Sequence, residues 1–244
     1  CYMSLMQRLK RRRWNPFSTI ALLCLLCFSG CGDRDETNKQ RFLIRGNEAL
    51  AQQNYREANR LYSEALVIDS CYVPALNNIG IAQFEQQHYG QAILYYDRAL
   101  LCDPEDYNAQ LNRSNAFYES GELYRAEDDL LFLKKNHPDS AAISFRLGIV
   151  HAKMKDFRAS VSDFNKALAQ SPELVEAWIN RGTSYYYLDE LTLAESDLRK
   201  ALQLSPEQGH AYNTLSMIYT KQDNLDQAIT YVNSALGFEP GDPY

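Results

Sequence analysis

The chain has 244 residues, of which 45% are hydrophobic and 12% aromatic, and a formal net charge of −6 at pH 7. This much apolar content excludes an intrinsically disordered chain, because it provides enough surface to build a core. The net acidity argues against nucleic-acid binding, which needs a basic surface that neutralises phosphates.

The N-terminal segment has the pattern of an export signal. A basic cluster at residues 8–13 precedes an uncharged apolar run, Phe17 to Phe28. Twelve residues are too few to cross a bilayer as a helix, but they match the centre of a secretory signal peptide. The following Phe28-Ser29-Gly30-Cys31 resembles the lipobox of bacterial lipoproteins. The resemblance implies a signal peptide over residues 1–30, attachment of a fatty acid such as palmitate to Cys31, and a short linker over residues 31–38. The alternative is an ordinary secretory signal peptide.

Removal of the signal peptide would make the chain more acidic. All five charged residues of residues 1–30 are basic, which leaves 20 basic and 31 acidic residues and a net charge of −11. Anionic headgroups would repel such a protein, so we expect membrane contact through the lipid anchor only.

Two cysteines remain after Cys31, at Cys71 and Cys102. Their spacing is not that of a metal site, so we expect no metal. Buried or half-buried thiols are the default expectation. A disulfide between them is the alternative, and it would require a compartment outside the cytoplasm.

Small residues and prolines recur every 34 residues along the rest of the chain. Prolines occupy one slot, at Pro104, Pro138, Pro172, Pro206 and Pro240. Small residues occupy another slot, at Gly46, Gly80, Ser114, Gly148, Gly182 and Ser216. A period of this length indicates a stack of identical supersecondary units that bury their faces against each other.

The spacing resembles the tetratricopeptide repeat, which has a small residue at position 8, alanines at 20 and 27, and proline at 32. The resemblance implies an all-α, right-handed α-solenoid of six helical hairpins over residues 39–242, followed by a C-terminal end at 243–244. The repeats are 39–72, 73–106, 107–140, 141–174, 175–208 and 209–242. Gly182, facing Ala194, is expected to let the two helices of repeat 5 approach closely.

The resemblance also implies that the first helices line a concave groove, through positions 2, 5, 6, 9, 12 and 13. Asparagine recurs there and could pair with a peptide backbone through both its donor and its acceptor, while aromatic residues would anchor side chains. The groove residues expected to bind a partner peptide are Asn78, Asn112, Asn115, Arg146, Asn180, Phe84, Tyr118 and Tyr186. The alternative is that asparagine is a tolerated polar residue on a solvated helix face.

The C-terminal end of the array is expected to expose an apolar edge formed by Ile229, Leu236 and Phe238. Either the terminus frays slightly, or the edge mediates homodimerisation or partner contact. The four histidines share no motif, and the carboxylates Asp128 and Asp129 are expected to be solvated. We therefore predict a non-enzymatic protein without a cofactor.

These patterns predict a scaffold or adaptor for protein or peptide partners, lipid-anchored in the bacterial cell envelope. The anchor would place it at the outer membrane, on the periplasmic or surface face. Two alternatives share the fold: an assembly chaperone for an outer-membrane complex, resembling the pilotins, and a regulator of cell-wall enzymes that acts through the convex face.

Overall fold

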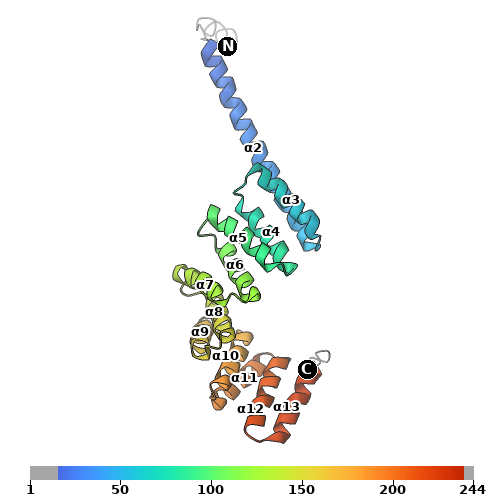
Figure 1. Ribbon diagram of the computed structural model, residues 1–244, viewed down its shortest axis with the longest axis vertical. Helices are drawn as coiled ribbons and strands as arrows, with labels where there is room; N and C mark the ends of the chain where they lie inside the picture. Colours follow the sequence, from blue (N-terminus) through green and yellow to red (C-terminus); the bar gives the residue numbers. More distant parts are fainter. Residues whose placement is uncertain (1–15, 239–244) are drawn as a thin grey trace, which may run out of the picture.

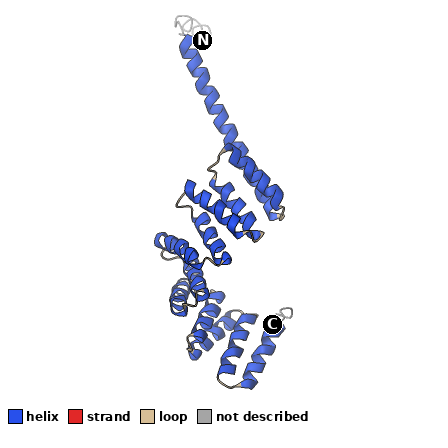
Figure 2. Ribbon diagram, viewed as in Figure 1, coloured by secondary structure: helices blue, strands red, loops and turns tan. Residues whose placement is uncertain are grey.

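The computed structural model describes the backbone of residues 16–238 and the side chains of residues 34–237. Every regular element in this part of the chain is a helix (Figure 2). The helices are α2 (Pro16–Ala51), α3 (Tyr55–Ile68), α4 (Val73–Glu85), α5 (Tyr89–Cys102), α6 (Tyr107–Ser120), α7 (Leu123–Asn136), α8 (Ala141–Lys153), α9 (Phe157–Gln170), α10 (Val175–Tyr187), α11 (Leu191–Leu204), α12 (Gly209–Lys221) and α13 (Leu225–Phe238).

The helices pair into consecutive antiparallel hairpins that stack into an elongated array (Figure 1). Each second helix also packs on the first helix of the next hairpin, so the core is continuous along the stack. The predicted all-α solenoid of helical hairpins is confirmed. The N-terminal half of α2 projects beyond the stack at one end, and α13 closes the other.

Small residues allow the two helices of a hairpin to touch. A methyl group added to Gly80 would lie 2.4 Å from Cε1 of Tyr96, and one added to Gly46 would lie 2.4 Å from Cε1 of Tyr62. Both tyrosines are buried. At Gly182 the added atom would lie 3.2 Å from the carbonyl oxygen of Ala194, which confirms the predicted close approach.

The turns inside the hairpins share one backbone feature. The residue at position 15 of each repeat has a positive φ, between 57° and 84°. These residues are Gln53, Gln87, Gly121, Lys155, Asp189 and Asp223. Only one of them is glycine, so packing between the helices holds the others in a left-handed conformation that L-residues otherwise disfavour. Between hairpins, α11 ends at Leu204, two residues before Pro206, as expected from the missing proline N–H.

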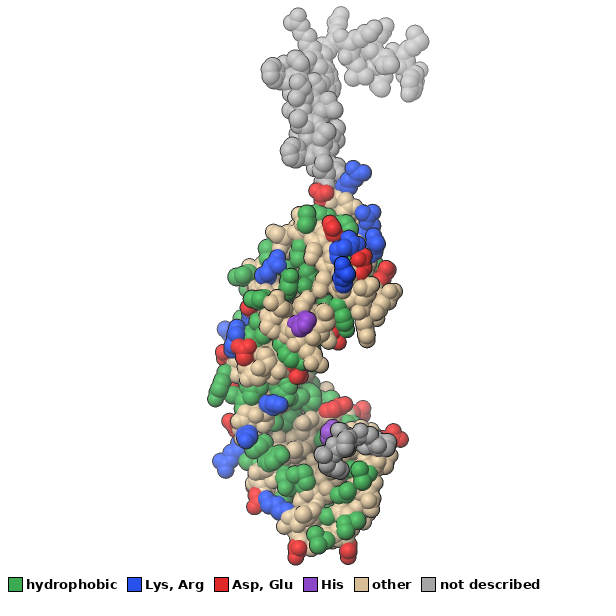
Figure 3. Space-filling model, turned by 45° about the vertical axis from the view of Figure 1, so that its right-hand side comes forward, with side chains coloured by type: hydrophobic (Ala, Val, Ile, Leu, Met, Phe, Trp, Pro, Cys, Tyr) green, Lys and Arg blue, Asp and Glu red, His purple; other side chains and the backbone are tan. Residues whose placement is uncertain are grey.

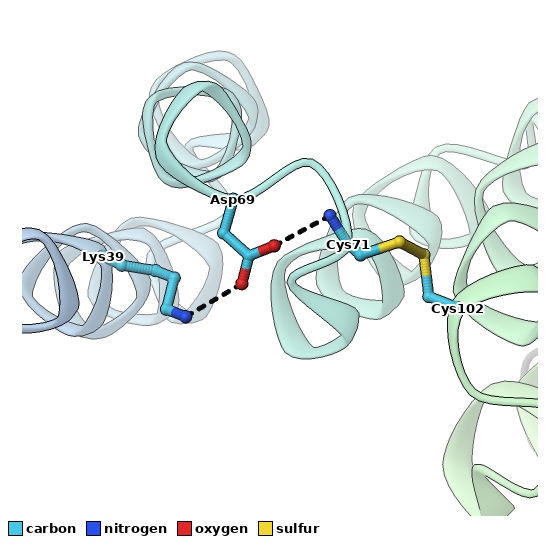
Figure 4. The surroundings of a disulfide bond; sticks show 4 residues. All are labelled: Lys39, Asp69, Cys71 and Cys102. Carbon is cyan, nitrogen blue, oxygen red and sulfur yellow. Dashed lines mark hydrogen bonds and ion pairs between the residues drawn. A yellow bond between two sulfur atoms is a disulfide. The ribbon is translucent and has the colours of Figure 1, made fainter. Parts of the chain in front are cut away.

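Cys71 and Cys102 form a disulfide, with their Cα atoms 5.5 Å apart. The default expectation of free thiols was therefore wrong. Cys71 lies in the α3–α4 loop and Cys102 is the last residue of α5, so the bond joins two successive inter-repeat connections. Figure 4 shows Asp69 beside it: Asp69 accepts from the Cys71 N–H at 3.0 Å and from Lys39 Nζ at 2.9 Å. These contacts tie α2 to the disulfide.

The segment predicted as a linker, residues 31–38, is part of α2. Contacts of Glu36 explain part of this difference. Its carboxylate accepts from Lys39 Nζ at 2.8 Å and from the Gln40 amide at 3.0 Å, and a helix brings side chains three and four residues apart together in this way. Eight helical residues span about 12 Å, against about 28 Å when extended.

The lipobox cysteine Cys31 and the predicted signal peptide lie outside the residues whose side chains are described. Within the described part, no helix is long and apolar enough to cross a membrane. Cleavage and lipidation at Cys31 remain predictions.

Candidate functional site

One side of the stack is hollowed, between the N-terminal and C-terminal hairpins (Figure 3). Two pockets open on surfaces formed mainly by first helices, as the position pattern predicts. We name them the Arg146 pocket, between α4, α6 and α8, and the Tyr186 pocket, between α10 and α12.

The Arg146 pocket has a volume of about 310 Å³. It brings together four of the predicted groove residues: Phe84 from α4, Asn115 and Tyr118 from α6, and Arg146 from α8. The rest of the lining is Ser114, Glu119, Leu130, Ile149 and Val150. Large apolar surface beside a few directed polar groups is typical of a binding pocket.

Arg146 gives this pocket a cationic group. Its guanidinium donates from Nη1 to Oδ1 of Asn115 at 2.6 Å, and among residues 34–237 it forms no ion pair with a carboxylate. Lys153 places its Nζ 5.8 Å from the centre of the Tyr118 ring. A guanidinium whose partner is a neutral amide keeps N–H donors that can bind an acidic side chain or a carbonyl oxygen.

The Tyr186 pocket is larger, about 460 Å³. Asn180 and Tyr186 are the predicted residues that line it. The other lining residues are Glu176, Ile179, Thr183, Tyr187, Gln208, His210, Asn213, Thr214 and Met217. His210, Asn213, Thr214 and Met217 were not among the predicted binding residues. The same position pattern, applied to repeat 6, would have selected all four.

Aromatic rings form one wall of the Tyr186 pocket. Tyr187 is 55% exposed and stacks on Phe157, with ring centres 4.6 Å apart and planes 13° apart. Lys221 lies 5.4 Å from the centre of the Tyr186 ring while its Nζ contacts Asp189 at 2.7 Å. These contacts hold the tyrosines in place, so a ligand would meet a wall that is already ordered.

Two of the predicted asparagines, Asn78 and Asn112, are hydrogen-bonded to asparagines of neighbouring repeats. The Asn78 amide donates to Asn47 at 2.7 Å, and the Asn112 amide donates to Asn77 at 3.0 Å. The amide of Asn77 lies 3.4 Å from the Asn78 oxygen, so four side chains connect three neighbouring repeats. Asn78 and Asn112 line neither pocket.

Asn180 bonds within its own helix, to the carbonyl oxygen of Glu176 at 2.7 Å. An amide nitrogen carries two hydrogens, so Asn112 and Asn180 each keep a donor for a peptide, whereas Asn78 also hydrogen-bonds to Tyr62. The structure therefore shows Asn78 and Asn112 joining neighbouring repeats, whereas Asn180 does not, and binding of a peptide by these asparagines remains a prediction.

Charged residues inside the stack were the main feature that the sequence did not reveal. Asp129 was expected to be solvated, but it is 5% exposed and accepts from Arg113 Nε at 2.8 Å and from Gln110 at 2.7 Å. Repeat 5 has the same pair, Arg181 to Asp197 at 2.7 Å. Arginine at position 7 with aspartate at position 23 was the available signal.

A second charged cluster joins repeats 3 and 4. His151 of α8 lies 2.8 Å from Oδ2 of Asp163 and 3.0 Å from Oε1 of Glu127. Lys134 of α7 donates to Oδ1 of Asp163 at 2.8 Å. Burial opposes ionisation of Asp163, but the hydrogen bonds from His151 and Lys134 outweigh it and lower its pKa to about 2.

The fold and the groove define a class of protein: a helical-repeat scaffold for protein–protein contact. Family models for the tetratricopeptide repeat match residues 73–106, 175–208 and 209–242. These matches start at the first residues of α4, α10 and α12. The chain therefore contains tetratricopeptide repeats over these three segments.

Curated relatives are similar over part of their length. The chain is 28% identical to Protein STIP1 homolog of Dictyostelium discoideum over 148 residues, 59% of this chain and 24% of that protein. It is 23% identical to Hsp70/Hsp90 co-chaperone CNS1 of Saccharomyces cerevisiae over 126 residues, 49% of this chain and 32% of that protein. The chain thus spans a quarter to a third of the length of these relatives.

Solved structures show the same fold at low sequence identity. PilF of Pseudomonas aeruginosa superposes with a TM-score of 0.71 at 18% identity, over 85% of this chain and 95% of that chain. MamA superposes with a TM-score of 0.60 at 22% identity, over 66% of this chain and 95% of that chain. At these identities the likeness concerns the fold alone.

Proposed function

We propose that this protein is an adaptor that holds an extended segment of a partner protein in its concave groove. The observation that carries the proposal is the pair of pockets on first-helix surfaces, each with half-buried aromatic side chains next to polar groups. Protein recognition commonly depends on a few such anchors and not on the whole contact area.

The Arg146 pocket supports a partner with an acidic side chain next to an apolar one. Arg146 would bind the carboxylate, since its structural partner is the neutral Asn115, and the rings of Phe84 and Tyr118 would contact the apolar neighbour. The Tyr186 pocket would take a second anchor further along the same segment, with hydroxyl and amide groups available to its backbone.

We further propose that the adaptor works in the cell envelope, anchored through lipidated Cys31. The disulfide supports this location, because disulfides persist in oxidising compartments and are rare in the cytosol. The sequence Phe28-Ser29-Gly30-Cys31 is the second support. The test is fractionation: Cys31→Ser should move the protein from the membrane fraction to the soluble fraction, and unchanged fractionation would contradict the anchor.

Site-specific photo-crosslinking in cells of the source organism tests the groove. A photoreactive residue at Tyr118 should capture a partner, and Arg146→Ala should remove that adduct. The matched control is Tyr124, which is on the second helix α7 and 77% exposed. The triple variant Asn78→Ala, Asn112→Ala and Asn180→Ala, with Arg146 unchanged, tests whether the asparagines themselves contribute to partner binding.

The control also tests a second candidate function, regulation of a folded enzyme through the convex face. That face exposes apolar side chains on α7, with Tyr124 at 77%, Leu131 at 46% and Phe132 at 40%. An adduct at position 124 with none at position 118 would refute groove binding and support this candidate. An adduct at 118 that requires Arg146 would support the groove.

A further inference from the structure

The outer face of α13 carries an apolar stripe that no described residue covers. Leu225 is 57% exposed, Ile229 60% and Leu236 44%, and half-buried Val232 lies between them. A helix turns 100° per residue, so these four residues lie within one narrow sector. Of the 14 residues of α13, Asp226 alone is charged.

In earlier repeats the positions of Ile229 and Leu236 are covered by the next hairpin, whereas the position of Val232 packs inside its own hairpin, as Tyr96 does against Gly80. Ile93, which corresponds to Ile229, is 7% exposed. Leu100 and Leu168 correspond to Leu236 and are 9% and 6% exposed. The stripe on α13 is therefore a surface of the kind that the array elsewhere buries against another helix.

The other end of the array is different. Arg41, Arg45 and Glu48 are exposed on α2. Their counterparts in α4 are Ala75, Ile79 and Ala82, whose exposed fractions are 0%, 2% and 0%. The first hairpin thus has charged side chains where the others have an apolar contact. Head-to-tail stacking of copies would bury these charges, which is costly without partners.

The spacing of the stripe fits a second copy of itself. The intervals from residue 225 to 229, 232 and 236 are four, three and four residues, the same in either direction. In an antiparallel pair, Leu225 would oppose Leu236 of the second copy, and Ile229 would oppose Val232 of the second copy. The two copies of Asp226 would lie at opposite ends of the contact, so their like charges would stay apart. A self-complementary patch of this kind forms a closed two-fold interface.

We propose that the protein forms a two-fold dimer through the apolar stripe of α13, with the two helices antiparallel. The dimer would place the two grooves in one particle, with the projecting α2 helices far from the contact. This inference does not depend on groove binding, because the stripe lies outside both pockets.

The first test is the molar mass of the full chain, purified in detergent with the disulfide intact and measured by light scattering corrected for detergent. Wild-type protein should have twice the chain mass, and Leu225→Glu/Ile229→Glu should have the mass of one chain. The matched control is Val67→Glu/Leu101→Glu, which alters residues that are 83% and 82% exposed elsewhere on the array and should leave the dimer intact. Circular dichroism checks that each variant keeps its helices.

The second test is the antiparallel register. Along the helix axis, the two copies of residue 229 should lie about 5 Å apart and the two copies of residue 225 about 16 Å apart. With Cys1, Cys24, Cys27 and Cys31 changed to serine, Ile229→Cys should join two chains through a short bis-maleimide linker, and Leu225→Cys should not. Linkage of both would indicate a parallel pair.

Three results would overturn the proposal. One is a wild-type chain that stays monomeric at every concentration, which would mean that another partner or residues 239–244 cover the stripe. Another is a Leu225→Glu/Ile229→Glu variant that remains dimeric, which would place the contact elsewhere. The third is efficient linkage of Leu225→Cys.

Discussion

At the scale of single residues, the packing inside a hairpin depends on which side chain faces the small residue. Gly46, Gly80 and Gly148 face aromatic rings, and an added methyl would lie 2.4, 2.4 and 2.6 Å from the nearest ring atom. Gly182 faces the smaller Leu198, and there the nearest atom would be 3.0 Å away. A ring at position 24 thus requires glycine at position 8.

Gly80→Ala should lower the free energy of unfolding by about 1–3 kcal/mol, because Tyr96 is buried and has little room to move. Gly90→Ala is the matched control: no atom lies within 4 Å of its added methyl, and alanine favours the helix by about 0.5–1 kcal/mol. Urea unfolding measures both. Tyr96→Leu should reduce the penalty of Gly80→Ala, and equal effects at Gly80 and Gly90 would contradict the packing argument.

At the scale of elements, the junction between repeats 3 and 4 is joined by charge. His151 of α8 lies between Glu127 of α7 and Asp163 of α9, and Lys134 and Lys166 also contact Asp163. When the imidazole is protonated, both its N–H groups donate to carboxylates. The Asp163 hydrogen bond raises the pKa of His151 above 6.5, although burial opposes this and Glu127 adds to it.

The stabilising effect of His151 should depend on pH. Because the folded pKa is raised, the contribution is complete below pH 6.5 and is lost as the pH rises through the folded pKa. The difference in unfolding free energy between wild type and His151→Gln should therefore shrink as the pH rises. Phe145→Leu, in the same helix, replaces no titrating group and should give a difference that is the same at every pH. A pH-independent effect of His151→Gln would contradict the ion-pair account.

At the scale of the whole molecule, the disulfide strengthens one end of an array whose units contact only their neighbours. It spans 31 residues of sequence, from the connection after repeat 1 to the end of α5. Asp69 and Lys39 extend the connection to α2. In a stack of this kind, a local bond protects nearby repeats more than distant ones. The disulfide therefore secures the hairpins nearest the proposed membrane anchor.

Reduction should destabilise repeats 1 and 2 by roughly 3–4 kcal/mol, the value expected from the entropy of a loop of this length. Hydrogen exchange measured with and without reductant tests this. Reduction should increase the exchange rate more over residues 39–106 than over residues 175–238. The variant Cys71→Ser/Cys102→Ser should exchange like the reduced protein and should not respond to reductant. Uniform acceleration along the whole array would show that the repeats unfold together.

The sequence by itself determined the architecture. The 34-residue period placed the first residues of α4, α6, α8, α10 and α12, and the prolines marked where second helices end. Both signals are local, because a small residue or a missing N–H acts on its own helix or hairpin wherever it occurs. Of the eight predicted groove residues, six line the two pockets, four in the Arg146 pocket and two in the Tyr186 pocket.

Only the tertiary structure decided which side chains pair. The Cys71–Cys102 bond, the asparagines joined across repeats and the buried Asp129 all depend on distances between different helices. Those distances follow from how closely the helices pack and how far successive hairpins rotate. The sequence specifies the residues at each position of a repeat, whereas this packing brings a residue of one repeat within reach of its partner in another.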